Sequence, residues 1–521
     1  MKPFLNHLLF VLLALLFASC QKDNIVLIDP IDTDDSEDLI ANTMFTQTVG
    51  VAFSTNGDAV VTGTNEDFTV TVSGNDVTII YAGEEYVMYE LSGTTNDGFF
   101  KLYSAKKQGI TLNGVNISNS NGAAINVQGT QAEPSKGKRT FIVLKGENSL
   151  ADGANYTDTP ATEDEKAAMF GEGQFIFSGE GSLTVTATGK SGIVSDDYVH
   201  FISGTITVNV SSSASVNGSD TLKPACVKGK DYVKMTDGAL TLTSTGTGGK
   251  GISSDGNGYF YGGSVNVTVT GNNFGSSGGS GGHGGWGNNS SDGVSAKGLK
   301  FDGNLIFKGS HVVVNCTAHE GIEAKGTLSV SGGEVYSHSL SDDAINSGGD
   351  FTISGGYVCG YSSGNDGLDA NGNCYIKGGV VYAISASSPE VAIDANSEGG
   401  YQLYLTGGTL VAIGGLESGS SLTQGCYSAS SWSQNTWYGL TVGSTTYAFK
   451  TPASGGTPLV ISGGSSPTLQ SNVNVAGGTK CFEGLFYMDA SVSGGNPVSL
   501  SSYTGGNGGG GGPGGGGHGP F

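Results

Sequence analysis

Four stretches of the sequence share one pattern: EGIEA at 320–324, DAINS at 343–347, DGLDA at 366–370 and VAIDA at 391–395. An apolar residue lies at the centre of each. The spacing is 23 residues from Ile322 to Ile345, 23 from Ile345 to Leu368 and 25 from Leu368 to Ile393. A nearly fixed period of this size is typical of a solenoid, because each repeat can lie directly on the one before it. We therefore predict that the four apolar residues stack inside such a fold, about 4.8 Å apart.

The surrounding residues indicate that each repeat consists of strands and tight turns. Strand-like residues follow each stretch and lead to a glycine pair, and these pairs are Gly332-Gly333, Gly355-Gly356, Gly378-Gly379 and Gly407-Gly408. Paired glycines allow backbone conformations that side chains forbid. Looser copies of the repeat lie at 192–193, 226–227, 251–252 and 298–299. A propeller blade needs a longer period and a leucine-rich repeat needs a different consensus, so we predict an all-β chain built as a right-handed parallel β-helix.

The rest of the chain divides around this repeat. The β-helix is expected over 104–415, with a glycine-rich loop at 275–293. Residues 43–103 should form an N-terminal β cap that includes a hairpin around Gly74-Asn75, because two alternating runs flank that turn. Residues 416–503 should form a C-terminal β region, and 504–521 a glycine-rich tail without a core.

Composition and charge narrow the function. The chain has 90 glycines in 521 residues and a formal net charge of −23, with 46 acidic against 23 basic residues. Such a charge repels polyanions, so nucleic acid is not an expected partner. An acidic protein can still hold an anionic polysaccharide if a divalent cation bridges the two.

The N-terminus has the layout of an export signal. Lys2 precedes an apolar run from Leu8 to Phe17, which is too short to span a membrane and is followed by Ala18, Ser19 and Cys20. The segment resembles a bacterial lipobox, in which Cys20 is acylated, although Phe17 replaces the usual leucine. We therefore expect a signal peptide at 1–19, a membrane anchor on Cys20 and an acidic tether at 20–42. The tether is similar to those of Bacteroidota surface lipoproteins, so the expected location is the bacterial outer membrane or cell surface.

Part of the sequence resembles a known family. SGT at 92–94, DG at 97–98, ITLNGVNI at 110–117 and the later Gly-Ile and Gly-Gly repeats resemble secreted bacterial carbohydrate-binding β-helix proteins. The resemblance covers about 86–415. It implies binding of cellulose or pectin-like polymers and bound calcium, and a fold similar to calcium-dependent β-helix polysaccharide lyases.

Acidic residues recur beside the stacked apolar positions. The position one residue after each apolar residue holds Glu323, Asn346, Asp369 and Asp394, and the position two residues before it holds Glu320, Asp343, Asp366 and Val391. Both positions lie on the side away from the core or at the adjoining turn. Carboxylates stacked about one strand spacing apart repel by roughly 1 kcal/mol per pair in water, so protonation or a cation must relieve them. Calcium accepts many oxygen ligands with tolerant geometry. We predict calcium as the cofactor, bound by Glu323, Asp343, Asn346, Asp366, Asp369 and Asp394; ordinary solvated turn acids are the alternative.

A lyase of this kind would also need a base near the metal. Candidates are Lys297, Lys300 and Lys325, of which Lys300 occupies the position equivalent to Glu323 and Lys325 lies beside Ala324. A lone lysine is more often a surface charge, and fold similarity does not carry function. We therefore favour a non-catalytic carbohydrate-binding surface protein, with a calcium-dependent polysaccharide lyase and a structural or adhesin-like protein as alternatives.

Aromatic residues are the other candidates for sugar contact, because their flat apolar faces pack against sugar rings. Trp432, Trp437 and Tyr438 lie close together, and for Trp432 and Trp437 a small hydrophobic core is a slightly favoured alternative to sugar contact. Trp286 lies in the glycine-rich loop. Six cysteines at 226, 316, 359, 374, 426 and 481 form no close pair, so no zinc knuckle is indicated. For Cys359 and Cys374 we favour buried thiols over a disulfide.

Overall fold

A computed structural model of the protein describes residues 36–157, 160, 162–217, 220–275, 293–464 and 466–505. The chain divides into two compact units, Met1–Thr43 and Met44–Phe521. The described part of the first unit contains two short 3-10 helices, η1 (Ser36–Asp38) and η2 (Ile40–Asn42). No helix among the described residues is long and apolar enough to span a membrane.

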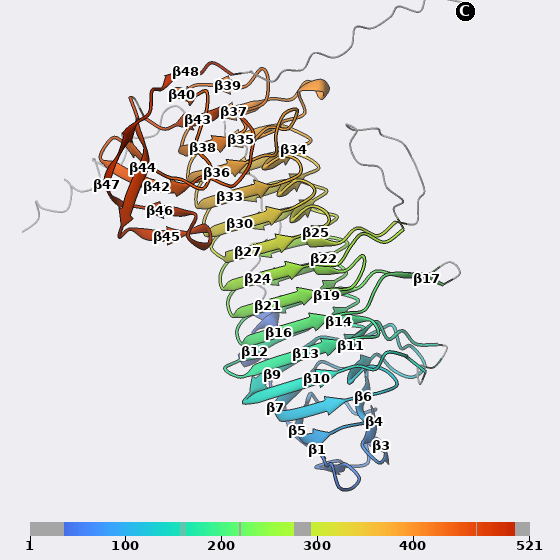
Figure 1. Ribbon diagram of the computed structural model, residues 1–521. Coiled ribbons are helices and arrows are strands. Elements are labelled where there is room, and N and C mark those ends of the chain that lie inside the picture. Colours follow the sequence, from blue (N-terminus) through green and yellow to red (C-terminus); the bar gives the residue numbers. More distant parts are fainter. Residues whose placement is uncertain are drawn as a thin grey trace, which may run out of the picture. The chain divides into compact units, whose positions relative to one another are not determined.

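Three parallel ladders of strands make up most of the second unit (Figure 1). From β8 to β36 the chain passes through ladder 1, ladder 2 and ladder 3 in that order and then begins again, apart from the small hairpin of β17 (Ser215–Asn217) and β18 (Asp220–Leu222). In the next pass, to β37 and β38, an isolated bridge at Ile393 takes the place of a ladder 1 strand. We call one such pass a rung. The all-β class predicted from the sequence is confirmed, because every described helix is a single turn.

Ladder 1 is a twelve-stranded sheet that opens with the antiparallel pair β3–β4 and continues in parallel. Its strands are β3 (Phe68–Ser73), β4 (Asp76–Tyr81), β6 (Phe99–Ser104), β8 (Ile125–Gln128), β11 (Ala167–Gly171), β14 (Ser191–Ser195), β19 (Ala225–Gly229), β22 (Lys250–Ser254), β25 (Lys297–Phe301), β28 (Ile322–Ala324), β31 (Ile345–Ser347) and β34 (Leu368–Ala370). The β3–β4 pair is the hairpin predicted around Gly74, whose φ is +62°.

Ladders 2 and 3 branch from shared strands. Ladder 2 contains β9 (Thr140–Lys145), β12 (Phe175–Gly179), β15 (Val199–Phe201), β20 (Tyr232–Met235), β23 (Asn257–Phe260), β26 (Leu305–Phe307), β29 (Leu328–Val330), β32 (Phe351–Ile353), β35 (Cys374–Ile376), β37 (Leu403–Leu405) and β39 (Ser421–Leu422). Ladder 3 contains β10 (Glu147–Ala151), β13 (Ser182–Ala187), β16 (Thr205–Val210), β21 (Ala239–Ser244), β24 (Ser264–Val269), β27 (His311–Cys316), β30 (Glu334–Ser339), β33 (Tyr357–Ser362), β36 (Val380–Ile384) and β38 (Thr409–Ile413). The long strand β7 (Gln108–Ser118) pairs with both β9 and β10. It continues downward through β5 (Val87–Thr95) to β1 (Gln47–Phe53), which also pairs with β2 (Val60–Thr62).

The core lies between the ladders and consists of like residues stacked on like. Ile322 pairs with Ile345, Ile345 with Leu368, and Leu368 with Ile393, all in parallel register and all fully buried. The stacking predicted from the 23-residue spacing is therefore confirmed. All six described cysteines are buried and unpaired, as favoured for Cys359 and Cys374.

The glycine pairs allow the turn from ladder 2 to ladder 3. The second glycine of each pair has a positive φ, for example +75° at Gly356. A Cβ atom there would also lie 2.8 Å from the backbone of the rung below. A side chain at this position would therefore both strain the backbone and separate two rungs.

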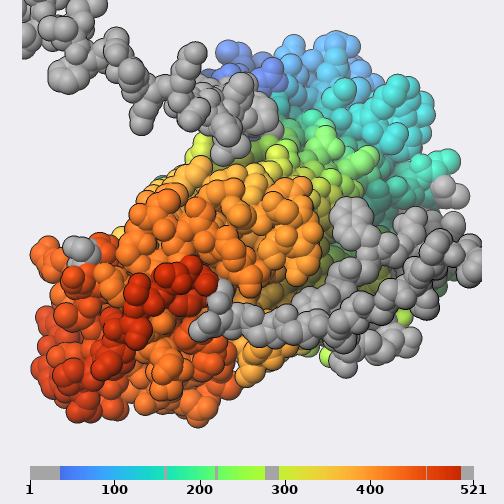
Figure 2. All heavy atoms as spheres, turned by 90° about the horizontal axis from the view of Figure 1, so that it is seen from above, coloured from blue at the N-terminus to red at the C-terminus, as the bar shows by residue number. Residues whose placement is uncertain are grey.

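A C-terminal module covers the upper part of ladder 3. Its six-stranded antiparallel sheet contains β41 (Trp437–Val442), β42 (Thr445–Lys450), β44 (Thr468–Ala476), β45 (Thr479–Cys481), β46 (Phe486–Met488) and β47 (Ser491–Pro497). Three further strands, β40 (Cys426–Ala429), β43 (Leu459–Ser462) and β48 (Ser501–Ser502), join the ladder end, with η3 (Ser397–Gly399) and η4 (Phe482–Gly484) in the connections. Outward residues Tyr336 and Tyr382 of ladder 3 form one apolar cluster with Phe449 and Phe486 of the module. In Figure 2 the red and orange residues of this region lie against the orange end of the ladders.

We expect the stacked core to control stability. Leu368→Ala should lower the free energy of unfolding by about 2–5 kcal/mol, because it leaves a cavity between Ile345 and Ile393. The outward-facing Ser329→Ala on β29 is the matched control and should change it by less than about 0.5 kcal/mol. Urea and thermal unfolding measure both, and equal effects of the two substitutions would contradict this assignment of the core.

Candidate functional site

The outward side of ladder 1 carries a column of charged and polar residues. The register aligns Lys300 with Glu323, Glu323 with Asn346 and Asn346 with Asp369. Asp394 continues the column, because Ile393 pairs with Leu368, and Glu417 follows it, because Leu416 pairs with Ile393. The strict register therefore places acids on acids along the upper rungs.

A second column runs beside the first at the entry to each strand. It contains Lys250, Lys297, Glu320, Asp343 and Asp366, all of them buried. We refer to Asn346 and the acids of both columns from Glu323 onward as the acid column: Glu323, Asp343, Asn346, Asp366, Asp369, Asp394 and Glu417.

Asn346 joins acids of adjacent rungs. Its amide Nδ2 donates to Asp343 Oδ2 at 3.0 Å and to Asp369 Oδ2 at 2.9 Å. Asp366 is held separately, since its Oδ1 accepts from the backbone N–H of Val391 at 2.6 Å. Five of the six predicted metal ligands thus lie on three successive rungs, and two of their carboxylates converge on one amide.

Crowding and burial perturb these carboxyl groups. Burial, followed by the charges of Asp369 and other neighbouring acids, raises the pKa of Asp343 well above its usual range. Burial also raises the pKa of Asp366, and burial together with Asp342 raises the pKa of Asp369 to about 6. Burial and a shared hydrogen bond with Glu417 raise the pKa of Asp394 to about 10. The acid column therefore favours a proton or a cation over bare negative charge.

Glu323 lies one rung before Asn346, but its carboxylate is engaged by a lysine. Lys297 Nζ is 2.7 Å from Glu323 Oε2 and 3.0 Å from Glu320 Oε2. The sixth predicted ligand is thus neutralised by a lysine, so a cation there would have to displace an existing ion pair.

The predicted lysines are also ion-paired. Lys300 Nζ lies 2.5 Å from Asp302 Oδ2, and Lys325 Nζ lies 2.8 Å from Asp302 Oδ1. Burial lowers the pKa of Lys300 in spite of this pairing. The shared carboxylate holds both amines beside ladder 1.

Lys250 is a site residue that the sequence reasoning missed. It is buried, and its Nζ donates to the carbonyl of Gly248 at 3.3 Å. Burial and the nearby charges of Lys297 and Lys300 lower its pKa to about 7. The looser repeat at 251–252 could have pointed to it. Lys250 lies two rungs before Glu320 and occupies the same place in its rung as Glu320 and Asp343 do in theirs.

An insertion covers the lower half of the same face. Lys101 on β6 pairs with Glu163 at 2.8 Å, and Asn126 on β8 donates to Glu165 at 2.6 Å. Nearby, Asp164, Glu172 and Asp196 form an acidic group, but Lys166 bridges two of them. The insertion thus contacts the lower strands β6 and β8, whereas the acid column lies on the upper ones.

The predicted aromatic contacts have different environments. Tyr438 is buried in the C-terminal module, with its ring stacked on Phe449, so it offers no face to a sugar and the core alternative applies. Trp432 is half-buried and donates to the Gly456 carbonyl, while the half-buried Trp437 packs edge-on against Tyr487. Trp286 lies outside the described residues, as does Cys20.

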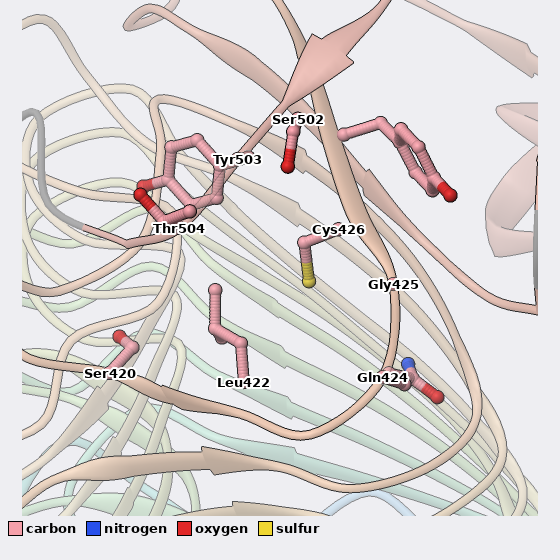
Figure 3. Close-up of a pocket in the computed structure, with 9 residues that line it drawn as sticks. Ser420, Leu422, Gln424, Gly425, Cys426, Ser502, Tyr503 and Thr504 are labelled. Atoms are coloured by element: carbon pink, nitrogen blue, oxygen red, sulfur yellow. The ribbon is translucent and has the colours of Figure 1, made fainter.

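Two other features offer sugar-binding chemistry. Half-buried Tyr375 and Tyr404 stack on ladder 2 with centroids 5.1 Å apart. A cavity of about 410 Å³ lies at the end of the ladders, lined by polar and aromatic residues around Cys426 and Leu422 (Figure 3). Neither the tyrosine stack nor the cavity has a repeated sequence pattern from which it could have been predicted.

Comparisons with known proteins show the family of the chain. A family model described as carbohydrate-binding domain-containing protein matches residues 73–367, which is more than half of the chain, and the protein belongs to this family. No curated protein matches the chain. Among solved structures the chain is similar to the polysaccharide lyase-like protein from C. thermocellum, determined as a gadolinium derivative. The identity is 18%, the match covers 62% of this chain and 96% of that chain, and the TM-score is 0.32.

The acid column should make stability depend on pH in a defined direction. The pKa of Asp369 is higher in the folded chain than its ordinary value near 4, so the ionised carboxylate destabilises the folded state. In chelator at pH 7, Asp369→Asn should therefore be more stable than the native protein. This difference should shrink as pH falls from about 6 to about 4, where both states hold the proton.

Asp302→Asn provides a control of opposite sign. Although burial opposes it, pairing with Lys300 and Lys325 lowers the pKa of Asp302. That substitution should lower the free energy of unfolding at pH 7, and this decrease should become smaller at low pH. If the free energy of unfolding of Asp369→Asn and of the native protein changed with pH in parallel, the raised pKa of Asp369 would be contradicted.

Proposed function

We propose that the protein is a cell-surface lipoprotein that binds polysaccharide without cleaving it, through a right-handed parallel β-helix formed by the three ladders. Membership of the carbohydrate-binding family is the observation that carries this proposal, because the matched residues 73–367 include most of the rungs. The fixed order in which the chain passes through the ladders supports the helical winding.

Calcium binding at the acid column is part of this proposal. Asp343, Asp366, Asp369 and Asp394 supply carboxylate oxygens on adjacent rungs, and calcium accepts such ligands with flexible geometry. A flip of the Asn346 amide would turn its oxygen toward the acids that its nitrogen now contacts. The raised pKa values supply a reason for the ion, since a divalent charge would relieve the repulsion. When bound, calcium can bridge the protein and the carboxylates of an anionic polysaccharide.

Chelation is the direct test of this metal. Calcium that binds only the folded protein should stabilise it by about 2.7 kcal/mol at a hundredfold excess over its dissociation constant. Chelator should therefore lower the melting temperature, and Asp369→Ala should blunt that change, while Asp58→Ala, an exposed acid, should not.

Binding should follow the metal in the same samples. An acidic polysaccharide such as polygalacturonate should lose affinity in chelator, whereas any binding of a neutral glucan should persist. If chelator alters neither melting nor binding, the acids are ordinary turn residues and calcium should be abandoned.

A calcium-dependent lyase is the second candidate, and one observation favours it. Lys250 is buried beside Lys297 with a pKa of about 7, in the range suited to a general base. The lysines first considered, Lys300 and Lys325, share the carboxylate of Asp302 instead.

Product formation separates the two candidates. Non-catalytic binding predicts no rise in the absorbance of unsaturated uronates when any bound polymer is incubated with protein and calcium. A rise that Lys250→Ala abolishes and Lys325→Ala retains would instead establish the lyase, with Lys250 as its base.

Anchoring through Cys20 completes the proposal. An acylated native protein should partition into the detergent phase, and Cys20→Ala should leave it in the aqueous phase. Equal partitioning of the two proteins would count against the lipid anchor.

A further inference from the structure

A second group of metal-ligating side chains lies at the entry to ladder 1. His319 and Glu320 are in the turn between β27 and β28, and Asp342 is in the equivalent turn one rung later. His319 Nδ1 contacts Glu320 Oε2 and lies 2.9 Å from Asp342 Oδ2. One imidazole nitrogen and two carboxylate oxygens, all within 4.8 Å of one another, therefore converge on one point.

The three side chains are held in this arrangement from outside the group. Asn365 donates to Asp342 Oδ1 at 3.0 Å, which leaves Oδ2 directed at His319. Ser339 donates its hydroxyl to the carbonyl of His319 at 2.8 Å and accepts from the N–H of Asp342 at 3.1 Å. Such supporting contacts orient ligands before a metal arrives.

We propose that His319, Glu320 and Asp342 form a binding site for a zinc-class divalent ion, distinct from the proposed calcium site. An imidazole nitrogen is a good ligand for zinc and related transition ions, whereas calcium prefers oxygen alone. Three protein ligands leave a fourth position for water or a sugar hydroxyl, as in open zinc sites. This inference does not rest on the proposed polysaccharide or calcium binding.

The positive charge of Lys297, which lies beside Glu320, is compatible with a bound divalent ion. Lys297 touches Glu320 Oε2, but its amine also pairs with Glu323 and can keep that partner when Glu320 turns to a metal. A protonated His319 would satisfy both carboxylates in the same geometry.

The test uses cobalt(II), whose visible absorption reports its ligands, with zinc as the competitor. The purified full chain should bind about one equivalent of cobalt that zinc displaces, and His319→Ala and Asp342→Asn should each weaken that binding at least tenfold. His311→Ala is the matched control, because His311 Nδ1 faces only Glu334, at 3.7 Å, and it should bind as the native protein does.

Asp369→Asn separates this site from the acid column. It should retain cobalt binding even if it loses the effect of calcium on melting. Cobalt binding that survives His319→Ala, or is absent from the native protein, would overturn the zinc-class site and leave the calcium proposal to its own test. Binding lost in Asp369→Asn but kept in His319→Ala would likewise overturn it, by placing the transition ion in the acid column.

Discussion

The structure depends on one constraint: each residue of a ladder must pair in parallel register with its counterpart one rung later. Inside, this requirement stacks Ile322, Ile345, Leu368 and Ile393 into a continuous apolar core. Outside, it brings Asp369 next to Asn346 and Asp394 with equal strictness. The stabilising core and the destabilising acid column therefore have a single cause, and a chain with acids at this repeat position cannot form one without the other.

Features that follow from periodicity could be predicted from the sequence. The spacing identified the stacked core, the glycine pairs identified the positive-φ turns, and alternating runs around Gly74-Asn75 identified a hairpin. Acids at repeat positions could be assigned to one flank for the same reason. In each case a local pattern was sufficient, because neighbouring rungs are built from neighbouring sequence.

Features that depend on distant packing could not be predicted. The sequence left sugar contact and core burial open for the aromatic group that includes Tyr438, and the choice depends on the C-terminal module, which turns its apolar side toward ladder 3. His319 and Asp342 lie in turns just outside the repeated motif, and only the register brings them together. The repeat at 251–252 could have marked the position of Lys250, but its lowered pKa could not be foreseen, because it follows from burial and then from lysines 47 and 50 residues further along the chain, at positions 297 and 300. Folding back of the insertion near Glu163 and Glu165 onto β6 and β8 likewise has no local sequence signal.

The regular rung of 23 residues also has a consequence for how such a protein can change. Loss or duplication of a whole rung, for example residues 322–344, would preserve the pairing of every other strand in ladder 1, whereas loss of a single residue would turn a strand's core side chains outward. Each upper rung, from β28 to β34, brings its own acids, so the charge of the flank would change in discrete steps with the number of such rungs. Gain or loss of a rung should therefore change this surface charge in whole units while the turns stay the same.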